Sequence, residues 1–150
     1  WLAQPALALS CIPPDLARAY IEADAAEESY LIGLGRFAFP AETLAPIPAS
    51  RDLREDRSAS ARFEGRLFSG RGFDFETTLD VEITARCLGH WCASFAPDVE
   101  VIAFIEDHDG EFALTVGPCG GSAFAEPTHA DIARIVSCHA GEACEPTKEY

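Results

Sequence analysis

The six cysteines are the residues of this chain with the clearest chemistry. They occupy positions 11, 87, 92, 119, 138 and 144. Their even number, without the C-x-x-C or C-x-x-C-H spacing of redox, haem and zinc sites, favours structural disulfides. Six cysteines permit fifteen pairings, so the connectivity stays open, although Cys87 with Cys92 and Cys138 with Cys144 would each close a short loop.

The loop from Cys87 to Cys92 carries the best candidate for a contact with a partner. Gly89, His90 and Trp91 lie inside it, so a disulfide there would hold an imidazole and a large aromatic ring on a constrained turn. Tryptophan is enriched at the energetic centres of protein interfaces. The alternative is that Trp91 is structural and covers one end of the fold.

Metal binding has no supporting pattern in the sequence. His108, His129 and His139 show no H-x-x-x-H pairing, which argues against a zinc site. The acidic residues around Gly110 lack the twelve-residue register of a calcium loop. We expect them at the solvated tip of a hairpin.

Catalysis likewise lacks a signature. Ser94 and Ser122 do not belong to a nucleophile elbow, and paired cysteines leave no thiol nucleophile. The glycine-rich stretch 117–121 is not followed by the Lys-Ser/Thr of a phosphate loop. We therefore expect no enzymatic activity and no cofactor.

The composition is that of a strongly acidic globular domain. Of 150 residues, 48% are hydrophobic, and 25 acidic against 11 basic residues give a formal net charge of −14. This length fits one domain with a hydrophobic core. The charge argues against nucleic acid and anionic membranes as partners, and no apolar run approaches the roughly 18 residues of an integral membrane span.

Residues 1–10 (WLAQPALALS) have the character of the end of a signal peptide. Ala6-Leu7-Ala8 fits the small-x-small cleavage pattern, and the chain contains no methionine. With the cysteines, this segment predicts a secreted or periplasmic protein. An ordered N-terminal arm is one alternative, and a lipid anchor on Cys11 is a weaker one. Residues 11–144 would form the folded domain and 145–150 a C-terminal tail.

Hydrophobic periodicity predicts a helix, five strands and a second helix. Apolar residues recur at helical spacing over 14–25 and 129–139. The strands are expected at 29–38, 61–69, 74–86, 99–106 and 111–116. Asp109-Gly110 predicts a tight hairpin between the last two strands. Five short antiparallel strands suit a small closed or partly open barrel.

Three details of this pattern are specific enough to test. Gly33 and Gly35 inside the first strand predict a bend or a bulge. Alternate residues from Phe75 to Ala85 are expected on one face of their strand. Residues 39–60, rich in proline, alanine and charge, are expected to form an exposed loop.

Four short motifs follow one another along the chain. They are an early cysteine before a helix that ends near Ala23-Asp24, the strand Leu31-Ile32-Gly33, the segment Cys92-Ala93-Ser94-Phe95, and Cys119-Gly120-Gly121-Ser122. In this order they resemble the motifs of the netrin-like module. Within that group, residues 11–138 look most like bacterial relatives of the tissue inhibitors of metalloproteinases. The resemblance implies a mainly β fold, a five-stranded OB-fold-like barrel with an N-terminal and a C-terminal flanking helix. It also implies a disulfide from Cys11 to Cys119, which completes the expected set.

The resemblance further implies an inhibitory surface. In those inhibitors the free amine and carbonyl of an N-terminal cysteine chelate the zinc of the protease. The matching ridge here would comprise Cys11, Ile12 and Pro13 beside Gly89, His90, Trp91 and Cys92. The inhibitors begin with Cys-x-Cys, whereas this chain has Cys11-Ile12-Pro13, and Cys11 would become N-terminal only by cleavage after Ser10.

Taken together, the sequence favours a secreted or periplasmic protein-binding module without catalytic activity. Its expected partner is another protein. A metalloprotease inhibitor that uses a processed Cys11 is the first alternative, and an uncharacterised hydrolase is the second.

Overall fold

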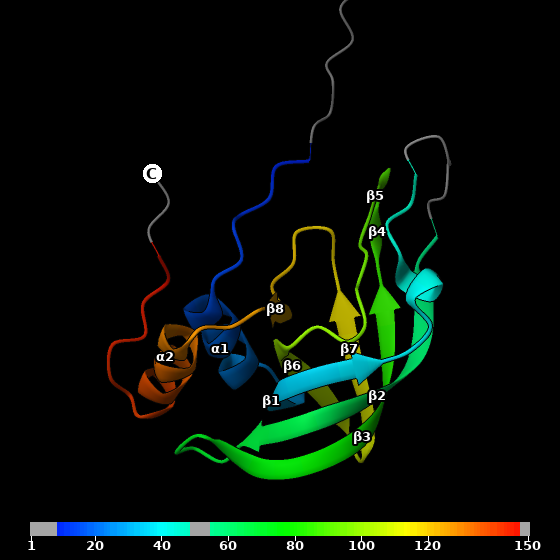
Figure 1. Ribbon diagram of the computed structural model, residues 1–150. Coiled ribbons are helices and arrows are strands. Elements are labelled where there is room, and N and C mark those ends of the chain that lie inside the picture. The colour runs from blue at the N-terminus through cyan, green and yellow to red at the C-terminus, as the bar shows by residue number, and fades with distance from the viewer. Residues whose placement is uncertain (1–8, 49–54, 148–150) are drawn as a thin grey trace, which may run out of the picture.

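The computed structural model describes residues 9–48 and 55–147 (Figure 1). Two α-helices, one 3-10 helix and eight strands lie in these ranges. In chain order the elements are α1 (Leu16–Ala25), β1 (Ser29–Ala38), the 3-10 helix η1 (Ala41–Leu44), β2 (Arg57–Phe68), β3 (Phe73–Ala85), β4 (Cys87–Leu88), β5 (Trp91–Cys92), β6 (Val101–His108), β7 (Glu111–Val116), β8 (Ala123–Ala125) and α2 (His129–His139).

Five strands close into a barrel. The pairing runs β1–β2–β3–β7–β6 and returns to β1, because β1 pairs with β6 as well as with β2. The fold is thus mainly β, an OB-fold-like barrel with one helix near each end of the chain, as expected. The expectation of purely antiparallel strands is wrong at one place, since β3 and β7 run parallel. Both helices lie together on one side of the barrel (Figure 1).

Strand β1 contains glycines where it pairs with two neighbouring strands, β2 and β6. Residues 33–38 of β1 pair with β2 and residues 29–35 pair with β6, so three residues are shared. Gly35 lies opposite Gly65 of β2. A Cβ atom on Gly35 would stand 2.7 Å from the Cα of Gly65 and 2.9 Å from the ring of Phe63. The register of β1 with both neighbours is continuous, so the predicted bulge is absent, and Gly35 instead allows a close approach of two backbones over which an aromatic ring packs.

Strand β6 separates two hydrophobic clusters. Its residues Ile102 and Phe104 face outward and pack with Leu16 of α1 and Ile135 of α2. The intervening residues belong to the barrel interior, namely Val101, Ala103 and Ile105. Because both faces of β6 are covered, its sequence is a nearly continuous apolar run and does not alternate.

Sequence and structure agree on most element boundaries. The bounds of β1, β7 and α2 coincide with the predicted ones, and the hairpin turn lies at Asp109-Gly110, where both residues have positive φ. Helix α1 begins at Leu16 because the side chain of Asp15 caps it, accepting from the backbone N–H of Arg18.

The exposed loop predicted at 39–60 is wrong at both ends. Leu44 of η1 is fully buried, and its carbonyl accepts a hydrogen bond from the Phe95 backbone at 2.9 Å. Strand β2 begins already at Arg57, because Ala59 and Ala61 face the barrel interior. Alanine carries too weak a hydrophobic signal to reveal this from the sequence. Residues 49–54 of the predicted loop lie outside the described residues.

Phe75 is exposed, unlike the other residues predicted to share its strand face. The β2–β3 register shifts between Leu67 and Phe68, which pair with Phe75 and Phe73 respectively. This irregularity buries Phe73 and leaves the side chain of Phe75 62% exposed. The rest of the predicted face, from Thr77 to Ala85, is buried or half-buried.

The glycine contact yields a stability prediction. Gly35→Ala should lower the free energy of unfolding by about 3 kcal/mol, because the new methyl group meets backbone that cannot move without breaking a strand pair. Gly72→Ala is the matched control, since a Cβ there has no atom within 4 Å. It should change stability by no more than about 0.5 kcal/mol in the same urea titration. Equal effects of the two substitutions would contradict the proposed role of Gly35.

Candidate functional site

All six cysteines are bonded, in the pairs expected. The disulfides are Cys11–Cys119, Cys87–Cys92 and Cys138–Cys144. Three disulfides in a domain of this size are typical of proteins that mature in an oxidising compartment.

The Cys87–Cys92 loop is a two-stranded hairpin that the sequence analysis did not predict as strands. Cys87 pairs with Cys92 and Leu88 pairs with Trp91 across β4 and β5. Gly89 has a φ of +60°, which suits the first central position of a two-residue turn. The side chains of Leu88 and Trp91 are 48% and 38% exposed, so two large apolar groups stand opposite each other in contact with solvent.

The base of this hairpin is held from several directions. The backbone N–H of Ala93 donates to the Arg86 carbonyl at 2.8 Å, and that of Cys87 donates to the Asp56 carboxylate at 2.9 Å. The Arg57 guanidinium donates to the carbonyls of Ala93 and Ala45, at 2.9 and 2.8 Å. These bonds and the disulfide fix the direction in which the hairpin leaves the barrel.

The Cys11 segment forms a second exposed surface. Its disulfide to Cys119 places residues 10–15 against 119–121, and together they line a shallow hollow of about 310 Å³. The side chain of Ile12 is 56% exposed. Gly89, His90 and Trp91 do not line this hollow. The segment and the β4–β5 hairpin project toward the same end of the molecule (Figure 1), and the residues of the expected ridge thus lie on two separate elements.

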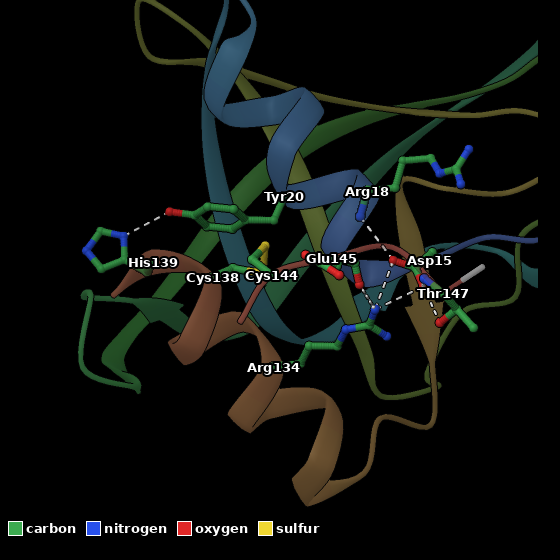
Figure 2. The surroundings of a disulfide bond; sticks show 9 residues. All are labelled: Asp15, Arg18, Tyr20, Arg134, Cys138, His139, Cys144, Glu145 and Thr147. Carbon is green, nitrogen blue, oxygen red and sulfur yellow. Dashed lines mark hydrogen bonds and ion pairs between the residues drawn. A yellow bond between two sulfur atoms is a disulfide. The ribbon is translucent and has the colours of Figure 1, made fainter. Parts of the chain in front are cut away.

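Asp15 fastens the Cys11 segment to the rest of the domain (Figure 2). Asp15 as a whole residue is only 9% exposed. It accepts hydrogen bonds from the Thr147 backbone at 3.0 Å, from the Thr147 hydroxyl at 2.9 Å and from Arg134 of α2 at 3.2 Å. Arg134 also donates to the Glu145 carbonyl at 2.8 Å. One carboxylate therefore links the start of α1, helix α2 and residues 145–147.

The pKa of Asp15 reflects this network. Burial would raise the pKa, but the hydrogen bonds from Thr147 and Arg18 and the charge of Arg134 outweigh it and lower the pKa from 3.8 to about 2. The ionised form is thus bound firmly in the folded protein.

His108 and His139 lie on different elements of the fold. His108 sits at the β6–β7 turn 2.9 Å from Glu106, which raises its pKa through a hydrogen bond. His139 ends α2 and lies 3.0 Å from the Tyr20 hydroxyl. Within residues 9–48 and 55–147, no three His, Cys, Asp or Glu side chains are grouped so that they could hold a metal ion.

A groove beside the helices is the main feature that the sequence analysis missed. It has a volume of about 610 Å³ and lies between the end of α1, the start of β1, the β2–β3 turn region and His139. Phe75, which the alternation pattern placed on the same strand face as Val81 and Ile83, lines it. The sequence signal for this groove is that Tyr20 and Tyr30 flank a short segment containing Asp24, Glu27 and Glu28.

Comparison with protein-family models, curated proteins and solved structures found no match to this chain. Among the described residues, neither helix has the length and apolar character needed to cross a membrane.

The Asp15 network predicts a specific pH dependence of stability. Because the folded-state pKa lies below the ordinary 3.8, the carboxylate contributes its full stability above that pH and loses it as the pH falls toward about 2. Asp15→Asn should therefore cost about 2 kcal/mol at pH 7 and almost nothing near pH 2. Urea titrations of both proteins across this range measure the difference. A cost that does not change with pH would contradict the assignment.

Proposed function

We propose that the protein is a non-catalytic module, secreted or periplasmic, that binds a partner protein through the β4–β5 hairpin. The observation that carries the proposal is the cross-strand pair of Leu88 and Trp91, both exposed on a disulfide-clamped turn. Three disulfides support maturation in an oxidising compartment outside the cytoplasm.

The clamp matters because binding requires interface groups to become ordered. Each immobilised flexible side chain or loop costs free energy on association, roughly 0.5–1.5 kcal/mol. Here the Cys87–Cys92 bond and the backbone bonds at the hairpin base have already fixed the turn. A rigid tryptophan that needs little further ordering is suited to act as a binding hot spot.

The test is quantitative binding by a Trp91→Ala variant. Proteins captured reproducibly from secreted and periplasmic extracts are identified by mass spectrometry, and the affinity of the purified partner is measured by calorimetry. Loss of a tryptophan hot spot of at least 2 kcal/mol corresponds to a Kd at least about 30-fold weaker. Leu88→Ala should weaken binding less, by about fivefold.

Ile21→Ala is the matched control for this experiment. Ile21 is 44% exposed on α1, so the variant also removes a large apolar side chain from the surface. It should leave the affinity unchanged. Equal recovery and affinity with Trp91→Ala would show that the hairpin is not the binding surface.

A second candidate function is metalloprotease inhibition by a form that starts at Cys11. The Cys11–Cys119 bond and the exposed Ile12 support it, because they match what the resemblance to the tissue inhibitors of metalloproteinases implies. In that form the Cys11 amine and carbonyl would chelate the zinc of the protease, and Ile12 would contact its substrate groove.

The N-terminus decides this alternative. A protein that starts at Cys11 should inhibit a zinc metalloprotease in a peptide-cleavage assay, whereas one that keeps Ser10 should not, because its amine is displaced from the zinc. Ile12→Ala in the Cys11-first form should weaken inhibition by about fivefold. Equal activity of the two forms would rule out zinc chelation by Cys11.

A further inference from the structure

The groove beside the helices combines apolar walls with an acidic rim. Its walls include the aromatic rings of Tyr20, Tyr30, Phe68 and Phe75. Phe75 is 62% exposed, the most exposed large hydrophobic side chain of the described residues. A volume of about 610 Å³ lies within the roughly 300–1,000 Å³ typical of ligand sites.

The walls are held in place by contacts among their own side chains. The Tyr20 hydroxyl lies 3.0 Å from Nδ1 of His139, which joins α1 to the end of α2 (Figure 2). The His139 ring stands at 84° to that of Phe68, with centroids 5.4 Å apart. Phe68 in turn packs against the buried Phe73 at 5.4 Å. The aromatic floor of the groove is therefore fixed by both helices and the barrel.

The charged residues that line the groove carry acidic side chains, apart from His139. Asp24, Glu27 and Glu28 are exposed at its rim, and no Lys or Arg is among the described residues that line it. Burial raises the pKa of Tyr30, and the charges of Glu106 and Glu28 raise it further. The phenol thus stays neutral in a negative surrounding.

From this combination we infer that the groove binds a basic, amphipathic peptide segment of a partner protein. Apolar side chains of the segment would pack on Phe75 and Phe68, and Lys or Arg side chains would lie between the tyrosine rings and the rim carboxylates. Cations are attracted both to aromatic faces and to carboxylates, so the two features of the groove favour the same ligand. This site is distinct from the β4–β5 hairpin and does not depend on the function proposed for it.

The probe is a fluorescein-labelled peptide in which leucine and lysine alternate, followed by fluorescence anisotropy. We expect it to bind the full chain, and the binding to weaken as salt is added. Peptides with glutamate in place of lysine, or serine in place of leucine, should not bind. Binding of the glutamate peptide, or no binding of the leucine–lysine peptide, would overturn the inference.

Variants of the groove locate the site. Phe75→Ala should weaken binding at least about fivefold without unfolding, because the side chain is mostly exposed. The double variant Glu27→Gln, Glu28→Gln should weaken it about fivefold and reduce its salt dependence.

Three controls test whether the groove itself holds the peptide. The double variant Glu42→Gln, Glu100→Gln changes net charge equally at exposed positions outside the groove, and it should bind as wild type does. A similar loss in this variant would mean that the peptide senses only the overall charge, and the inference would fail. Trp91→Ala should not affect this peptide, whereas a loss there would place the peptide on the hairpin. Binding of a simple alkylamine as tight as that of the peptide would mean a small-amine site and would also overturn the inference.

Discussion

The barrel depends on β1 pairing with two strands at once. At Gly33, Leu34 and Gly35, β1 pairs with β2 along one edge and with β6 along the other. The backbones of β1 and β2 can approach closely here because Gly35 and Gly65 have no side chains, and the ring of Phe63 covers both. Without the β1–β2 pairing across these glycines the sheet would remain open, and β1 and β2 would each have an unpaired edge.

Closure also determines where the exposed features lie. Because β3 and β7 run parallel, the chain must return along the barrel between them. Strand β6 makes this return, and the β4–β5 hairpin lies in the connection from β3 to β6. The helices cover the outer face of β6 and β1, and the groove forms where that cover ends at His139 and Phe75. The hairpin and the groove are thus consequences of one topology, on different parts of the barrel surface.

Most of the fold could be predicted because its strands and helices carry strong periodic signals. The alternation in β3 and the Asp109-Gly110 turn located their elements closely. The predictions that were wrong have physical causes. Ala59 is buried by position and not by its own hydrophobicity, so β2 began earlier than its pattern indicated.

Of the two candidate sites, one could be predicted from the sequence and the other could not. Trp91 was identified because a short disulfide loop and a tryptophan are both local features of the sequence. The groove was not, because Tyr20, Phe75 and His139 come from three distant segments. The exposure of Phe75 also depends on a shift in strand register, which no local pattern reveals.

The three disulfides differ in the stage of biogenesis at which they can form. Cys87–Cys92 and Cys138–Cys144 join residues 5 and 6 positions apart, so their sulfur atoms meet often even in an unfolded chain. Cys11–Cys119 spans 108 positions and encloses the strands of the barrel. Its thiols come together efficiently only after the long-range strand pairs have formed, a slow step in such topologies. Oxidation of this pair therefore reports that the barrel has closed.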